Sequence, residues 1–339
     1  MNKLLFLPVW ILSLISSTAG AQQKDKGDAA FYTASQQWFN AWKLLSKEVF
    51  HLDSTYPVDF LFFDKDFVYS TSAVSVVKGK AVAGPALMGS AYQWRKAAHN
   101  GTLTLPDSSQ VPIGLMSFAA KNTLQQAKPF FVMPLPSFWK SAGVESKELG
   151  DDNLYTGVFL HEFSHSQQMQ NFGMELDALE KAFDFTGDFN DNIVQDLFKG
   201  DSSYLGYYSS EVDLFYNAVK ETDYLKRQQA TENSLAEMRK RHARFFKDKP
   251  GSLPSIDEFF LTMEGMGQYT MYAWLTHPKG AGLPKEQVIT GVRRGKNQWS
   301  QDEGFALFLI LEQKSPAAKW APAMFGNKTI SVIDLLEKR

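Results

Sequence analysis

The most informative stretch of this chain is Val158-Phe159-Leu160-His161-Glu162-Phe163-Ser164-His165. Residues four apart on a helix lie on one face, a turn from each other, so the imidazoles of His161 and His165 can reach one metal ion. Glu162 lies about 100° further round the helix and can reach a water at that ion instead of the ion itself. The order His-Glu-x-x-His therefore suits two zinc ligands and a general base.

The flanking residues favour a helix that crosses a core. Val158-Phe159-Leu160 is apolar, Asp151-Asp152 can cap the start of a helix, and Gly173 can end it. We therefore expect a helix that begins at residue 151 and ends at residue 173. Gln167 and Gln168 depart from this pattern, because such helices usually turn apolar at those positions.

The motif resembles that of the zincin superfamily of zinc metallopeptidases. The resemblance implies a twisted sheet before the motif, helices after it and an active-site cleft between the two. It also implies Zn²⁺ as cofactor, a peptide or protein as substrate, and Glu162 as the base that takes a proton from the attacking water. The firm likeness covers only the short segment around the motif, so it indicates a superfamily and not a family.

The third zinc ligand is the least determined part of the site. A catalytic zinc ion takes three protein ligands and leaves one position for water. The metzincin spacing would place a third histidine at position 171, which is Asn171, so that branch is excluded. The spacing of thermolysin and the aminopeptidases would place a glutamate near position 184. Asp184 and Phe185 stand there, so only Asp184 is a candidate at short spacing.

Three distant glutamates are further candidates for the third ligand. Glu264-Gly265 lies on a predicted helix and is similar to the Glu-Gly-Phe-Ala-x-Tyr string whose glutamate binds zinc in an aminopeptidase family of the gluzincins. A glycine beside the glutamate lets two helices approach closely, so Glu264 is favoured. Glu211 is the alternative, because gluzincin topology usually supplies the ligand from the first long helix after the motif. Glu303, in Glu303-Gly304-Phe305-Ala306, copies the same string nearer the C-terminus.

Composition limits the kinds of site and partner. The chain has 339 residues, of which 44% are apolar, 14% aromatic and 21% charged, as expected of a globular protein with a sizeable core. It contains no cysteine, so a metal must be held by His, Asp and Glu. The formal net charge of −2 shows no electrostatic footprint for nucleic acid. The oligomeric state and the choice between endo- and exopeptidase stay open.

The N-terminus has the order of a secretory signal peptide. Lys3 supplies a charge, Leu4 to Ile15 is an apolar run, and Ala19-Gly20-Ala21 fits a cleavage site. The apolar run is too short to span a hydrocarbon core of roughly 30 Å, which argues against a membrane anchor. We expect cleavage near Ala21 and a secreted or periplasmic mature chain without an integral membrane segment.

The apolar patterning predicts an α+β fold in two parts. After the signal peptide at 1–21, an α+β subdomain is expected over 22–150, and the active-site helix with a helical subdomain over 151–339. Helical spacing and short apolar runs bounded by Pro, Gly, Asp and Ser indicate the elements. Helices are expected over 30–50, 84–98, 203–226, 232–247, 255–275 and 301–313 and from 331, and strands over 58–63, 67–69, 111–116 and 130–133.

Three weaker features bear on substrate binding. Residues 130–133 lie between two prolines, which suits an edge strand on which an extended peptide adds. The basic run 239–244 predicts a solvated helix face, or else an arginine that binds a substrate carboxylate. Several tyrosines are candidates for stabilising an oxyanion, although core positions explain most of them better: Tyr204, Tyr207, Tyr208, Tyr269 and Tyr272.

Two principal hypotheses about function follow. The first is a zinc-dependent metallohydrolase, most simply a peptidase, in which Glu162 removes a proton from the attacking water. The alternative is a non-catalytic zincin-fold binding or assembly protein that keeps a structural or relic metal site. The intact Glu162 argues against this alternative, because a structural site has no use for a general base. A third hypothesis is a zinc hydrolase of a non-peptide amide, such as a cell-wall linkage.

Overall fold

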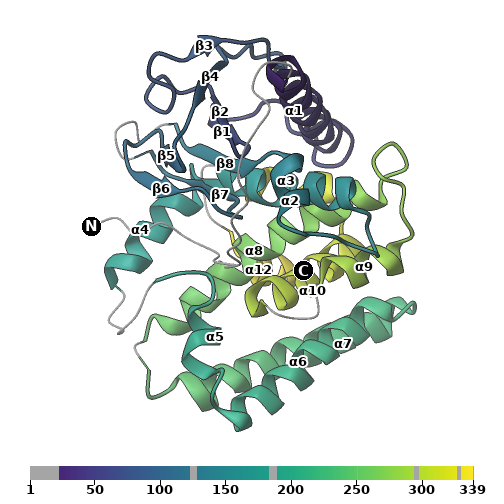
Figure 1. Ribbon diagram of the computed structural model, residues 1–339. Helices are drawn as coiled ribbons and strands as arrows, with labels where there is room; N and C mark the ends of the chain where they lie inside the picture. Colours follow the sequence, from purple (N-terminus) through teal and green to yellow (C-terminus); the bar gives the residue numbers. More distant parts are fainter. Residues whose placement is uncertain are drawn as a thin grey trace. The chain divides into compact units, whose positions relative to one another are not determined.

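The computed structural model describes residues 23–122, 128–182, 189–249, 251–293, 298–326 and 330–338 (Figure 1). The predicted signal peptide and the candidate ligand Asp184 lie outside these ranges. The predicted α+β class is confirmed, because a small mixed sheet lies in the first part of the chain and helices follow it. None of the helices in the described ranges has the length and apolar character that crossing a bilayer requires.

The strands of the described ranges all lie between residues 59 and 134, and helices form the elements before and after them. The helices are α1 (Gln23–Glu48), α2 (Pro136–Ser141), α3 (Asp151–Gln168), α4 (Phe172–Ala182), α5 (Ile193–Phe198), α6 (Ser202–Lys220), α7 (Tyr224–Arg241), the π-helical turn η1 (His242–Phe246), α8 (Leu253–Thr276), α9 (Lys285–Val292), α10 (Trp299–Lys314), α11 (Ala317–Met324) and α12 (Val332–Glu337). The strands are β1 (Asp59–Phe63), β2 (Phe67–Ser70), β3 (Lys80–Ala81), β4 (Arg95–Ala98), β5 (Thr102–Thr104), β6 (Gln110–Pro112), β7 (Phe118–Ala120) and β8 (Phe130–Pro134).

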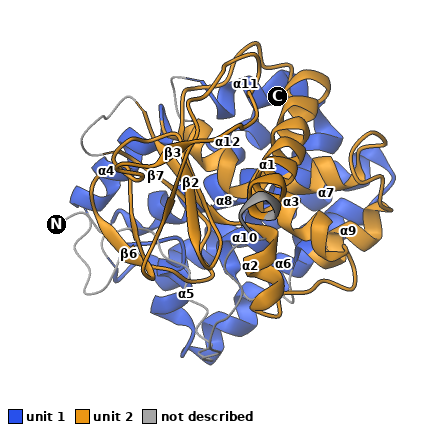
Figure 2. Cartoon of the chain, turned by 45° about the horizontal axis from the view of Figure 1, so that its top comes forward, with its two compact units in different colours: residues 1, 170–270, 292–339 blue, residues 2–169, 271–291 orange. Residues whose placement is uncertain are grey.

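Two compact units make up the chain (Figure 2). One contains the described residues up to 169 together with 271–291, and the other contains 170–270 and the described residues from 292 onward. The helix α3 belongs to the same unit as the sheet, where it contacts α1, β7 and β8. The boundary expected at residue 150 lies one helix before this division.

The main sheet has the strand order β3-β4-β2-β1-β8-β7. Its central pair, β1 and β8, is parallel with Leu61 opposite Val132, and the other pairs are antiparallel. Every residue of β1 and β8 is buried. Strands covered on both faces read as continuous apolar runs without alternation, which is why these two segments were recognisable in the sequence.

Aromatic side chains connect this sheet to α1 and α3 within the same unit. Phe60 stacks on Phe163 of α3 at a ring-centroid distance of 5.6 Å, and Trp38 of α1 stacks on Phe159 at 5.5 Å. Phe131 meets Phe159 edge to face at 5.3 Å. Aromatic pairs in these geometries contribute about 0.5–1.5 kcal/mol each beyond burial, so the motif helix is firmly held on the sheet.

Two expectations for the first part of the chain are wrong. The strand at 130–133 is not an edge strand, because β8 pairs with β1 on one side and with β7 on the other. Its flanking prolines stand at the strand ends, where they do not disturb the ladder. The helix expected over 84–98 is absent as well: Arg95–Ala98 is β4, which pairs with β2 and β3.

The predicted helices of the second part are largely confirmed, with corrected boundaries. The segments 255–275 and 301–313 lie in α8 and α10, and Ser331 caps α12 by accepting from the backbone N–H of Asp334. The helix expected over 203–226 ends early, at Lys220. The chain breaks there because Asp223 accepts from the backbone N–H of Lys226 and so begins α7.

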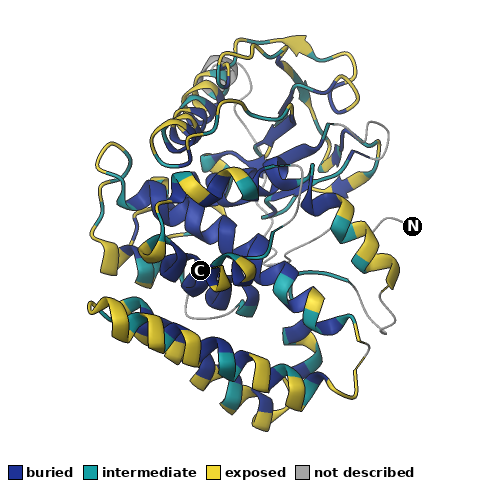
Figure 3. Cartoon of the chain, turned by 180° about the vertical axis from the view of Figure 1, so that it is seen from behind, coloured by how far each residue is buried: buried dark blue, intermediate teal, exposed yellow. Residues whose placement is uncertain are grey.

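Burial differs between these helices. Almost every residue of α8 and of the first three turns of α10 is buried, whereas α6 and α7 each expose one face (Figure 3).

Within their unit, α8 and α10 approach backbone to backbone at Gly265 and Gly304. A Cβ added to Gly265 would lie 2.5 Å from the carbonyl carbon of Gly304, and one added to Gly304 would lie 2.3 Å from the carbonyl oxygen of Leu261. Only glycine fits at this crossing.

Replacing Gly304 with alanine is expected to lower the free energy of unfolding by roughly 1–3 kcal/mol, because the new methyl group forces two backbones apart. Urea unfolding followed by circular dichroism measures this. The matched control is Gly206→Ala on α6, where a Cβ meets nothing within 4 Å. That variant should gain about 0.5–1 kcal/mol from helix propensity. Equal effects at the two glycines would contradict the close crossing of α8 and α10.

Candidate metal centre

The helix α3 presents the His-Glu-x-x-His motif from a buried position. All its residues from Leu154 to Gln168 are buried. The N-cap residue is Gly150, and the Asp151 carboxylate accepts from the backbone N–H of Ser146 instead of capping the helix. The helix ends at Gln168, so the expected end at Gly173 is wrong, and that glycine lies in α4.

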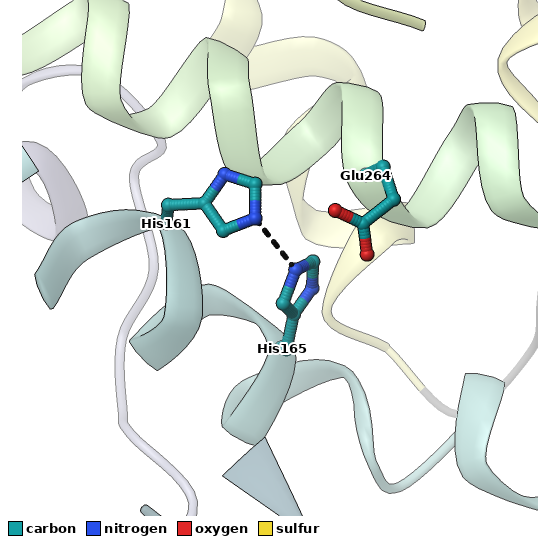
Figure 4. Close-up of side chains that lie close together, drawn as sticks. All are labelled: His161, His165 and Glu264. Atoms are coloured by element: carbon teal, nitrogen blue, oxygen red, sulfur yellow. Dashed lines mark hydrogen bonds between the residues drawn. The ribbon is translucent and has the colours of Figure 1, made fainter. Parts of the chain in front are cut away.

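The two histidines face each other across one turn (Figure 4). Nε2 of His161 lies 3.0 Å from Nε2 of His165, and the two rings are nearly perpendicular at 89°. Two nitrogens bound tetrahedrally to one zinc ion at about 2.0–2.1 Å lie roughly 3.3 Å apart. The spacing in this structure is close to that value, so the pair fits a metal ion with little side-chain movement.

The polar residues at the end of α3 have structural partners. Nδ1 of His165 lies 3.2 Å from Oε1 of Gln168. A histidine that donates from Nδ1 keeps the lone pair of Nε2 for a metal, and such a partner also fixes the ring orientation. Oε1 of Gln167 accepts from the backbone N–H of Tyr56 at 2.8 Å. These contacts explain why the sequence stays polar at positions where an apolar residue was expected.

Glu264 of α8 completes a three-residue group with the histidines (Figure 4). One ligand atom from each of His161, His165 and Glu264 lies within 4.8 Å of the others, and all three residues are buried. Two imidazoles and one carboxylate form a set that could hold a metal ion. Of the glutamates weighed from the sequence, Glu264 is the one that the structure brings to the histidines.

The register of α8 agrees with this grouping. A Cβ added to Gly157 of α3 would lie 2.6 Å from Cε of Met271, so the two helices are in tight contact there. Gly157 lies one turn before His161, and Met271 lies two turns after Glu264 on the same face of α8. Because α8 is one continuous helix, the face that packs on α3 at Met271 is also the face that carries Glu264.

Glu211 and Glu303 have a different role. Nε of Arg241 donates to both carboxylate oxygens of Glu211 at 3.0 Å, and its NH2 group donates to Glu303 at 3.0 and 3.2 Å. The NH1 group donates to Asp257 at 3.0 Å and to the Tyr204 hydroxyl at 2.8 Å. The two alternative ligands therefore belong to a buried ion cluster centred on Arg241.

The solvated face predicted for residues 239–244 is wrong for its central arginine. Arg241 has 0% of its surface exposed, while Arg239 and Lys240 on either side are exposed. For Arg241 the alternative, an arginine that binds a substrate carboxylate, does not apply either, because its guanidinium donors bind carboxylates of the protein itself. Arg241 comes three residues after Met238 and six after Leu235 on the buried face of α7, so the helical period was the signal that could have predicted its burial.

The ion cluster shifts several pKa values. Burial lowers the pKa of Arg241, but Glu303, Asp257 and the other partners outweigh it and raise that pKa well above the usual value. Burial, together with Glu211 and Asp257, raises the pKa of Glu303 well above its usual value despite the opposing charge of Arg241. Burial also raises the pKa of Asp257, yet Arg241 and His242 outweigh it, so the net shift is downward.

The candidate oxyanion tyrosines Tyr204, Tyr208, Tyr269 and Tyr272 are buried, and Tyr207 is half-buried. The Tyr208 hydroxyl donates to the carbonyl of Trp299 at 2.9 Å, and the Tyr269 hydroxyl donates to Glu312 at 3.0 Å. The residues that sequence reasoning missed are glutamines: Gln168 beside His165, and Gln301, whose Nε2 donates to Oε2 of Glu264 at 3.0 Å.

No protein-family model, curated protein or solved structure matches the chain. The functional conclusion therefore depends on the residues of the site itself. They offer three buried residues on two helices that could hold a metal ion, with a glutamate beside the first histidine.

Proposed function

We propose that this chain is a zinc-dependent metallohydrolase of zincin-like fold, most simply a peptidase that acts outside the cytoplasm. The observation that carries the proposal is the buried group of His161, His165 and Glu264. A set of two histidines and one glutamate is the ligand set of catalytic zinc sites that keep one position open. The signal-peptide pattern at residues 1–21 supports export.

Glu162 supplies the acid–base chemistry in this proposal. It follows His161 on α3 and is 9% exposed, so it is buried, as the three candidate ligands are. A zinc ion bound here would lower the pKa of water toward about 7 and polarise the substrate carbonyl. Glu162 accepts the proton of the attacking water and returns it to the leaving amine, so the peptide bond is split into an acid and an amine.

The position of β7 supports an extended peptide as substrate. In the described part of the sheet β7 (Phe118–Ala120) is the edge strand beside β8, and it contacts α3 within the same unit. An extended peptide can add to such an edge through main-chain hydrogen bonds. β7 takes the role that the sequence had suggested for residues 130–133.

The test is the zinc content of the purified mature protein, measured by elemental mass spectrometry beside two variants. We expect about one zinc ion per wild-type chain. Glu264→Gln should weaken zinc binding by more than the roughly 10–100-fold that loss of an outer partner costs, because it removes a ligand. Glu258→Gln, a half-buried glutamate of the same helix, is the control and should bind zinc like the wild type. A wild type that holds almost no zinc after incubation with the metal would contradict the proposal.

A further inference from the structure

We infer that Gln301 is a positioning residue that orients the metal ligand Glu264, and that Gln268 in turn orients Gln301. The inference rests on the proposed function, because it takes Glu264 to be a ligand. All three residues belong to one unit of the chain, on α8 and α10. None of the sequence patterns pointed to either glutamine.

The hydrogen bonds run in one direction through these residues. Nε2 of Gln301 donates to Oε2 of Glu264 at 3.0 Å. Oε1 of Gln301 accepts from Nε2 of Gln268 in a short hydrogen bond. The opposite orientation of the Gln301 amide would place its oxygen against a carboxylate oxygen, so Glu264 selects the orientation observed, and Gln268 donates to the amide oxygen on the other side.

Burial makes this arrangement energetically demanding. Gln301 is 7% exposed, Gln268 is 4% exposed and Glu264 is 4% exposed. A buried amide or carboxylate that loses its hydrogen-bond partner destabilises the fold, because its desolvation free energy is no longer compensated. These side chains therefore keep their hydrogen bonds. Rotation of the Glu264 carboxylate about its terminal bond would break the bond to Gln301. The carboxylate therefore stays in one orientation before a metal arrives.

The glycine crossing explains why Gln301 reaches Glu264. Gly304 lies three residues after Gln301, on the same face of α10, and Gly265 follows Glu264 directly on α8. Because these glycines let the two backbones touch, the Gln301 side chain extends along α8 and meets both Glu264 and Gln268. The Glu-Gly string thus serves the contact of α8 with α10, and through it the orientation of the ligand.

Neighbouring residues fix the rotation of α10 about its axis. Asp302 accepts from Arg293 at 2.7 and 3.0 Å, and Glu303 is bound to Arg241. These pairs lie on faces of α10 other than that of Gln301, so they keep the glutamine directed toward α8. A neutral amide donor adds no positive charge beside Glu264, whereas a lysine or arginine partner would oppose metal binding.

The experiment measures the zinc dissociation constant by competition with a chromophoric chelator. Gln301→Met keeps the side-chain length and removes both hydrogen bonds, and we expect zinc to bind about 10–100-fold more weakly. The visible absorption of the Co²⁺-loaded variant should shift as well, because the carboxylate is free to change its orientation. The control is Gln313→Met on the exposed end of the same helix, which should bind both metals like the wild type.

A second variant covers the case in which Gln301→Met does not fold. Gln268→Met leaves the bond between Gln301 and Glu264 but removes the hydrogen bond that holds the Gln301 amide from its other side, so zinc should bind more weakly than to the wild type. Wild-type zinc affinity and an unchanged Co²⁺ spectrum in both glutamine variants would overturn this inference alone. A wild type that binds no zinc would overturn the proposed function, and this inference with it.

Discussion

Replacing Arg241 with methionine is expected to lower the free energy of unfolding by about 3–5 kcal/mol. The change leaves Glu211, Asp257 and Glu303 in the interior without the guanidinium that neutralises them. A buried charge that loses its partner keeps its full desolvation cost, and here three carboxyl groups lose their ion pair with Arg241. Urea unfolding of the zinc-free protein measures the effect without a contribution from metal binding.

Two comparisons make this stability prediction specific. Lys240→Met removes only an exposed pair with Glu237 and should cost less than about 1 kcal/mol. Adding Glu303→Gln to Arg241→Met should recover part of the loss, because it removes one of the carboxyl groups left behind. If Arg241→Met proves no worse than Lys240→Met, the buried ion cluster does not stabilise this unit of the chain.

Replacing Glu162 with glutamine is expected to lower kcat for peptide hydrolysis by about 10²–10⁴-fold, because it removes the group that accepts the proton of the attacking water. The substitution keeps the size of the side chain and spares the three metal ligands. Zinc content should therefore stay at the wild-type value. Release of amines from a mixture of peptides gives the rate, and elemental mass spectrometry gives the zinc content of the same samples.

The control for this prediction is Glu180→Gln, an exposed glutamate of α4, which should leave kcat unchanged. Wild-type and Glu162→Gln proteins that bind zinc and are equally inert would contradict the peptidase. That result would favour the alternative, a zincin-fold binding or assembly protein with a structural or relic metal site. Activity confined to non-peptide amides, with the same loss in Glu162→Gln, would support the third hypothesis.

Local features of the site could be predicted because they depend on helical spacing. His161 and His165 share a face of α3 whatever the rest of the chain does. The interior strands β1 and β8 were visible for a similar reason, since burial on both faces gives continuous apolar runs. The helix wrongly expected over 84–98 shows the limit of such patterns, because β4 forms only through pairing with β2 and β3.

The identity of the carboxylate that joins the histidines was decided by tertiary structure. The sequence favoured Glu264, but the same Glu-Gly string occurs at Glu303, and Glu211 lies on the first long helix after the motif, so all three stayed candidates. Packing separates these candidates. Arg241 binds Glu211 and Glu303, while the register of α8 places Glu264 with the histidines. The sequence by itself determined how His161, Glu162 and His165 are placed relative to one another, because one helix sets their geometry. The position of Glu264 beside the histidines, and that of Gln301 beside Glu264, depend on contacts between residues far apart in the chain, and only the folded structure brings those together.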